Sequence, residues 1–171
     1  NVATSGGFTI LGNLTMSGAG VVAALAANPS DPTITVNGVF SQTAGTFGAN
    51  ATTTDFILTF GGGSLTRTLS VTAGTFYAKV IVPSGETVTL ASNVTMAYAQ
   101  VGAGNEALKV TGTGIMDTGI YVLTMSGIYL QDGGIFNGNS GSHQFNGAFT
   151  LSGTGVFNPS ASTSFGSTFT V

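Results

Sequence analysis

Two short stretches, Leu123-Thr-Met-Ser-Gly127 and Phe149-Thr-Leu-Ser-Gly153, carry the pattern that decides the fold. In both, apolar residues alternate with Thr or Ser, and the stretch ends at Gly. Alternation at a period of two indicates a β-strand with one buried face. The closing Gly permits the sharp turn that so short a strand requires. The pattern therefore predicts very short strands separated by tight corners.

Segments of this kind recur along the chain, in strict or degenerate form. They begin at residues 14, 34, 56, 69, 88, 108, 123, 149 and 169, with a mean spacing of about 19 residues. This period predicts an all-β fold, a β-solenoid (parallel β-helix) with coils of about 20 residues stacked about 4.8 Å apart. We expect residues 1–171 to form a single domain of roughly eight degenerate repeats. The alternative fold is a β-sandwich or jelly roll, which also has short strands and Gly turns.

A second pattern, Gly followed by any residue and a large apolar one, comes after the first. Gly45-Thr-Phe47, Gly74-Thr-Phe76 and Gly134-Ile-Phe136 are examples. In stacked coils we expect such aromatic residues to lie above one another inside, namely Phe47, Phe76, Phe136, Phe145, Phe157 and Phe165. Thr on an outer face would form ladders from coil to coil. Residues 20–28 fit either a short helix or a buried strand.

The composition excludes several classes of function. Charged residues make up 5 % of the chain, against about 25 % in typical domains. Only three residues are basic, and the net charge is −3, so we expect no nucleic-acid binding. The chain has no Cys and one His, so thiolate chemistry is excluded and we expect no metal or other cofactor. No apolar run reaches the length of a transmembrane helix.

The C-terminal third resembles the Gly/Thr/Asn-rich repeats of large bacterial and archaeal surface proteins. Gly134-Ile-Phe-Asn-Gly-Asn-Ser-Gly141 and Phe149-Thr-Leu-Ser-Gly153 carry this resemblance. The style is similar to that of β-helix adhesins and autotransporter passengers. The resemblance implies an extracellular or cell-surface location and a structural or adhesive role, without catalytic residues.

The sequence contains short matches to catalytic motifs, but each is better interpreted as a structural feature. We therefore do not expect an enzyme. Asp117-Thr-Gly119 matches an aspartic-protease triplet, but no second triplet supplies the other carboxylate. Gly102-Ala-Gly104 leads into a strand pattern, whereas a dinucleotide loop opens a helix. The lone His143 alternates with Phe145, which predicts a buried, hydrogen-bonded ring. Asp117 and Asp132 could reach neighbouring coils, but a calcium site needs more oxygen ligands.

Three Asn-Xaa-Thr sequons are candidate glycosylation sites: Asn13, Asn50 and Asn93. The chain begins at Asn1 without Met, and we interpret it as a mature or excised chain. A glycan-binding adhesin or phage-fibre segment would need exposed tyrosines, and the candidates are Tyr77, Tyr98, Tyr121 and Tyr129.

Strand-like segments extend almost to both ends of the sequence, and no charged or helical cap is visible. Uncapped end coils expose strand edges that can pair with another chain. We therefore expect a structural subunit of an extracellular filament or surface assembly, which polymerises head-to-tail through strand edges or exchanges a terminal strand. The partner would be a second copy, and cell-surface glycans are the alternative. The expected contact residues are Phe8, Ile10, Phe165, Phe169 and Val171.

Overall fold

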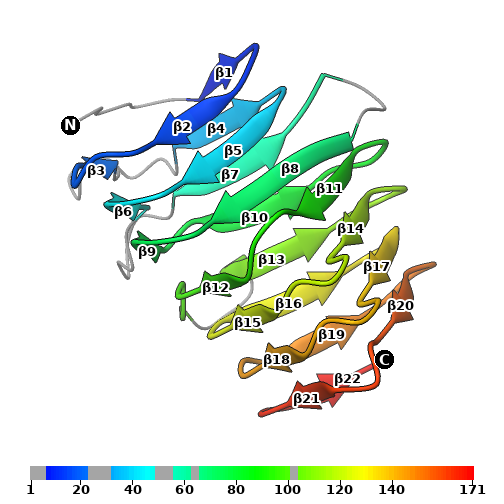
Figure 1. Ribbon diagram of the computed structural model, residues 1–171. Coiled ribbons are helices and arrows are strands. Elements are labelled where there is room, and N and C mark those ends of the chain that lie inside the picture. Colours follow the sequence, from blue (N-terminus) through cyan, green and yellow to red (C-terminus); the bar gives the residue numbers. More distant parts are fainter. Residues whose placement is uncertain (1–6, 23–31, 49–55, 63–65, 101–103) are drawn as a thin grey trace.

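The computed structural model describes residues 7–22, 32–48, 56–62, 66–100 and 104–171. Within these ranges the chain contains strands and no helix, and it winds into stacked coils (Figure 1). Every strand pair among them is parallel. The predicted β-solenoid is therefore confirmed. The β-sandwich alternative is excluded, because its sheets are antiparallel.

Each coil contributes one strand to each of three sides, and two of these sides are continuous sheets. Sheet A consists of β1 (Phe8–Ile10), β4 (Thr33–Val36), β7 (Ile57–Phe60), β10 (Lys79–Val82), β13 (Glu106–Val110), β16 (Ile128–Gln131), β19 (Phe149–Leu151) and β22 (Phe169–Thr170). Sheet B consists of β2 (Leu14–Met16), β5 (Val39–Gln42), β8 (Thr66–Val71), β11 (Thr87–Leu90), β14 (Ile115–Asp117), β17 (Ile135–Asn137) and β20 (Val156–Asn158).

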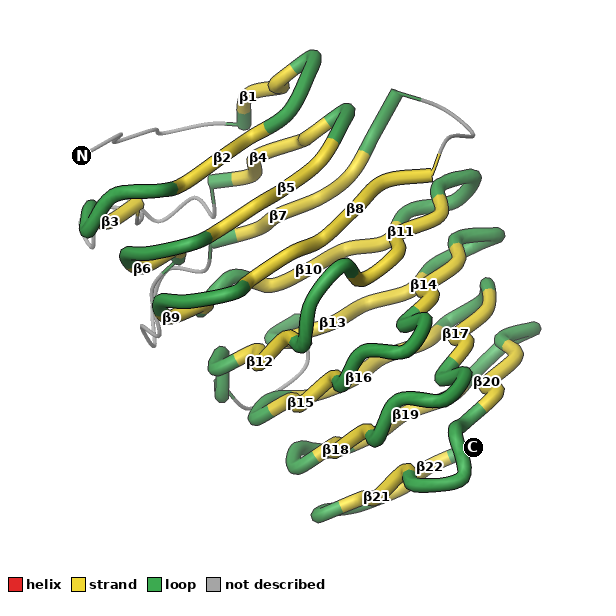
Figure 2. Tube along the Cα trace, viewed as in Figure 1, coloured by secondary structure: helices red, strands yellow, loops and turns green. Residues whose placement is uncertain are grey.

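The third side is divided between two sheets. Sheet C consists of β3 (Val21–Val22), β6 (Thr46–Phe47) and β9 (Thr75–Phe76). Sheet D consists of β12 (Val94–Met96), β15 (Leu123–Met125), β18 (His143–Phe145) and β21 (Thr163–Phe165). β9 does not pair with β12, so the third side has a step between these two strands. Sheets A and B continue without a break at this level. Figure 2 shows the corners stacked above one another on either side of this step.

The coils are unequal in length. Along sheet A, the paired inward residue lies 26, 24, 22, 28, 21, 20 and 20 residues further on at each successive strand. The expected length of about 20 residues thus fits the last coils best, and the earlier coils are longer. At about 4.8 Å per strand, the seven spacings make sheet A about 34 Å wide.

Aromatic side chains fill the interior as columns that run along the coil axis. Phe47 stacks on Phe76, with ring centroids 5.7 Å apart and planes 13° apart. Phe136 stacks on Phe157, and Phe145 stacks on Phe165. These three pairs contain all six residues expected to stack inside. Each aromatic pair stabilises the fold by about 0.5–1.5 kcal/mol beyond the burial of its area.

Thr ladders cover parts of the outer faces, as expected. On sheet A, Thr9 pairs with Thr35, and Thr35 pairs with Thr59. On sheet D, Thr95 pairs with Thr124. Of residues 20–28, Val21–Val22 form strand β3, and residues 23–28 lie outside the described ranges. None of the described residues belongs to a helix long and apolar enough to cross a membrane.

Candidate functional site

The C-terminal end coil presents an apolar edge. Its strands β20, β21 and β22 are each the last of their sheet, so one side of each has no strand partner within the described chain. Phe165 and Phe169 are 38 % and 48 % exposed, whereas most residues of the aromatic core are fully buried. Val171 is 83 % exposed. These three expected contact residues therefore lie together on the end coil.

The exposed rings continue the interior columns. Tyr129, Phe149 and Phe169 form one column on sheet A, with centroid separations of 4.6 Å and 4.9 Å. Phe165 adds to Phe145 on sheet D, and its ring also packs edge-on against Phe169 at 4.8 Å. Each column thus ends with one ring face covered and the other open.

The N-terminal end coil has the same kind of edge. β1, β2 and β3 are the first strands of their sheets. Phe8 and Ile10 point inward from β1, where they pair with Ile34 and Val36, and both are half-buried. Leu14 of β2 is half-buried in the same way and packs against the core.

Charge is absent from both ends of the sequence. All nine Asp, Glu, Lys and Arg residues lie between Asp31 and Asp132, so residues 1–30 and 133–171 contain none. Soluble proteins commonly protect open strand edges with charged side chains, Lys above all. Neither end coil has such protection among the described residues. Leu14 of β2 and Phe157 of β20 also belong to the end coils, although they are not among the expected contact residues.

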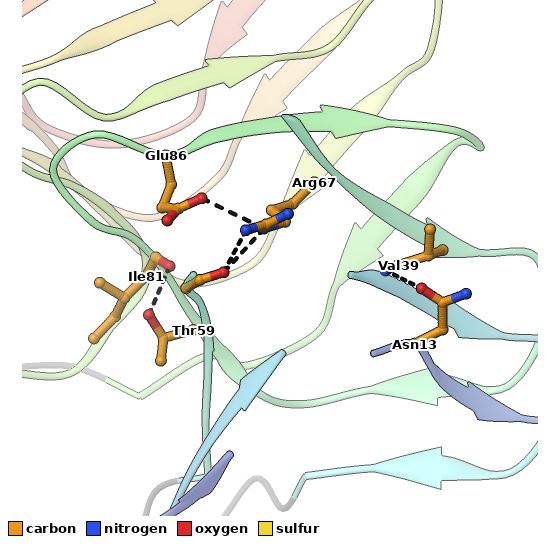
Figure 3. A network of polar contacts seen from close by, with 7 residues as sticks. Asn13, Val39, Thr59, Arg67, Ile81 and Glu86 are labelled. Carbon is orange, nitrogen blue, oxygen red and sulfur yellow. Dashed lines mark hydrogen bonds and ion pairs between the residues drawn. The ribbon is translucent and has the colours of Figure 1, made fainter. Parts of the chain in front are cut away.

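The interior also contains a buried ion pair, shown in Figure 3. Arg67 points inward from β8 and Glu86 lies just before β11, with 3.4 Å between Nε and a carboxylate oxygen. The same guanidinium donates hydrogen bonds to the Gly61 carbonyl from Nε and Nη2, at 3.0 and 2.6 Å. Both side chains are about 5 % exposed. Through Gly61, the pair links the corner between sheets A and B to the interior, which is a structural role.

His143 is buried and hydrogen-bonded, as predicted. Its Nδ1 accepts the backbone N–H of Leu123 at 3.2 Å, so Nε2 carries the hydrogen and donates to the Gly138 carbonyl at 2.7 Å. Thr118 Oγ1 lies 3.2 Å from Nε2. Burial lowers the pKa of His143 from its ordinary value of 6.5, and the hydrogen bond to Gly138 opposes that shift. The ring is therefore a neutral link between neighbouring coils.

The acidic residues singled out in the sequence have separate partners. Asp117 accepts hydrogen bonds from the Gly119 backbone and the Asn139 amide, both at 2.8 Å. Asp132 pairs with Lys109 at 3.5 Å on the surface. No group of three or more His, Asp or Glu residues suited to a metal ion occurs within the described ranges.

Two of the three sequons lie at exposed corners. Asn13 and Asn93 are exposed, and the Oδ1 of each accepts a backbone N–H from the next coil, that of Val39 and that of Val122. A glycan would attach to the amide nitrogen, which leaves these oxygens free to keep their hydrogen bonds. Asn50 lies outside the described residues.

The tyrosines do not form the platform that glycan binding on a flat face would need. Tyr98 and Tyr129 are fully buried, and Tyr129 donates a hydrogen bond to Gln131 inside the coil. Tyr77 and Tyr121 are half-buried. A shallow groove of about 390 Å³ follows the corner between sheets D and A, and no charged side chain lines it.

Comparison with known proteins found no match, whether among family models, curated proteins or solved structures. The function must therefore be inferred from the residues themselves.

Proposed function

We propose that the chain is a structural subunit of an extracellular filament or surface assembly, in which copies join through the strand edges of their end coils. The observation that carries this proposal is the uncharged, apolar edge of the C-terminal coil. Phe165, Phe169 and Val171 are exposed there beside strands that have no partner on one side among the described residues.

The energetic basis of the contact is burial together with strand pairing. An added strand would satisfy the open backbone groups of β22 and cover the open face of Phe169. Burying an aromatic side chain of this size contributes about 1.5–3 kcal/mol. Because no charged side chain lies at this edge, the contact would have no like-charge repulsion to overcome.

The buried polar groups support a structural role. Arg67 forms an ion pair with Glu86, and His143 accepts the Leu123 N–H, and both contacts hold neighbouring coils together. The extracellular location is supported by the exposed sequons at Asn13 and Asn93 and by the low charge of the chain.

The test is electron microscopy of the purified 171-residue chain, combined with light scattering of the same sample. We expect filaments or larger assemblies of the 17.0 kDa chain. The variant Phe169→Lys should remain monomeric, because it places a charge at the open end of the aromatic column. The matched control is Ile120→Lys, which changes a 75 % exposed apolar residue at the corner between β14 and β15.

Circular dichroism would establish that both variants keep the β-fold. A wild-type chain that stays at 17.0 kDa at every concentration would contradict the proposal. If both lysine variants lost assembly equally, the association would be unspecific and the end coils would not be responsible. A monomer that binds glycans would favour the adhesin alternative.

A further inference from the structure

The two outermost strands of sheet A have matching sequences. β1 begins Phe8-Thr9-Ile10, and the last strand reads Phe169-Thr170-Val171 through the residue that follows it. In both, an aromatic residue points inward and a Thr outward, followed by a β-branched residue. These strands lie at opposite edges of the same sheet. A second copy placed beyond either edge would therefore meet a strand of its own kind.

We infer that copies join in a single polarity, with β22 of one copy parallel to β1 of the next, in the register Phe169 to Phe8, Thr170 to Thr9 and Val171 to Ile10. The inference rests on the proposed function and specifies its interface. It makes sheet A one uninterrupted parallel sheet along the assembly.

The contact between β19 and β22 is the template for this junction. Phe149 and Thr150 pair there with Phe169 and Thr170. The two Phe rings stack with 4.9 Å between centroids and 11° between planes. The junction would repeat this contact, because Phe8 would cover the open face of Phe169. The outer Thr ladder would likewise run from Thr170 through Thr9 into Thr35 and Thr59.

The third side of the coil differs between the two ends of the chain. Inside the chain, sheet A continues without a break where the third side changes from sheet C to sheet D. The N-terminal coil carries its third strand in sheet C and the C-terminal coil in sheet D. Inside the chain, the change from β9 to β12 leaves the pairing of β7 with β10 intact. At the junction only sheet A pairs, because among the described residues sheet A has eight strands and sheet B seven, which leaves β20 and β2 two strand spacings apart.

A contact between two C-terminal coils would not continue the columns. Such a contact is two-fold symmetric, and it would make β22 antiparallel to its own copy. Pairing centred on Thr170 would then place Phe169 opposite Val171. Only the head-to-tail arrangement keeps the parallel pairing of the strands and sets aromatic residues over aromatic residues.

Disulfide trapping tests the register, because the chain has no Cys of its own. Thr9→Cys and Thr170→Cys are made as separate chains, and both positions are exposed on the outer face. Directly paired strand positions fall within the Cα separation that a disulfide accepts, about 4.4–6.8 Å. The control is the double variant Thr150→Cys with Thr170→Cys, whose positions are paired within one chain.

The control should form an intramolecular disulfide under mild oxidation, which establishes that this geometry permits the bond. We expect a mixture of Thr9→Cys and Thr170→Cys chains to form mixed dimers that are lost on reduction. Each chain alone should form none. The double variant Thr9→Cys with Thr170→Cys should form a covalent ladder of polymers.

The register and the function can fail separately. Assemblies without the mixed link, or with Thr170→Cys homodimers, would overturn the inferred register and polarity and leave the proposed function standing. A chain that is monomeric by light scattering would overturn both.

Discussion

His143 shows at the scale of one residue how a polar ring can sit inside this solenoid. Both ring nitrogens have partners that suit the neutral form, namely the Leu123 N–H and the Gly138 carbonyl. Protonation of Nδ1 would set a second hydrogen against the Leu123 N–H. The native state therefore favours the neutral ring, in agreement with the lowered pKa.

This preference predicts a pH dependence of stability. The unfolded chain takes up a proton near pH 6.5, whereas the folded chain resists it. The contribution of the neutral His143 ring to the free energy of unfolding should be fully present above pH 6.5. It should be lost as the pH drops below that value toward the lower pKa of the folded state. Urea midpoints measured between about pH 7.5 and 5 should show this decline. The chain has no other His, so His143→Gln should flatten the dependence of the urea midpoint on pH. An equal pH dependence in both proteins would mean that other groups cause the decline.

The Arg67–Glu86 pair gives a second prediction. Glu86→Gln leaves a buried guanidinium without its counter-charge, which should reduce the free energy of unfolding by about 3–5 kcal/mol. The double variant Arg67→Met with Glu86→Leu removes both charges and should recover much of that loss. Urea unfolding of Arg67→Met, Glu86→Leu and the double variant measures the coupling. Strictly additive effects would mean that the two side chains do not act as a pair.

At the scale of the strand, Gly determines how closely neighbouring coils approach. A Cβ added to Gly147 would overlap the Gly127 carbonyl of the preceding coil. A Cβ on Gly18 would meet open space. Neither backbone has a positive φ, so the comparison isolates contact from backbone strain.

Gly147→Ala should therefore destabilise the fold by about 1–3 kcal/mol, the usual cost of overpacking. Gly18→Ala should change stability by less than about 0.5 kcal/mol, as surface substitutions do. Thermal unfolding followed by circular dichroism compares the two variants. A wild-type melting temperature for Gly147→Ala would show that the corner can widen freely.

Strands were predictable from the sequence, but the side of the coil that each occupies was not. The pattern beginning at Leu14 marks sheet B, at Ile34 sheet A and at Leu123 sheet D. Apolar alternation reports one buried face, and all sides of the solenoid have such a face. The strands of sheet C have two residues each, such as Val21–Val22, which is too short for a period-two pattern. The step from sheet C to sheet D therefore had no signal.

The end-coil residues were predictable for a related reason. Phe8 and Phe169 belong to strand patterns that lie near the ends of the sequence, so stacking places them on the outermost coils. Phe157 has the same alternation in Val156-Phe-Asn158 and was still missed as an end-coil residue. Buried Arg67 could not be foreseen, because its partner Glu86 comes from the next coil and no local pattern joins them.

At the scale of the whole molecule, the distribution of charge predicts how assembly responds to salt. The end coils contribute no Asp, Glu, Lys or Arg to the proposed junction. The junction would therefore contain few charge–charge interactions that salt could screen. Assembly should persist from low salt to about 1 M NaCl. Light scattering across this range of salt concentration measures the size of the assemblies. Dissociation on adding salt would point to ion pairs formed by residues 31–132 instead.

The unequal coils have a mechanical consequence. If the chain were held by its two ends and stretched, coils would peel away one after another, and each would release a length set by its residue count. An extended residue spans about 3.4 Å, so a coil of 28 residues would release about 95 Å and one of 20 about 70 Å. Peeling from the C-terminal end would begin with two nearly equal steps, whereas peeling from the other end would begin with longer ones. The sequence of step lengths in a force trace would thus reveal the end at which the solenoid first yields.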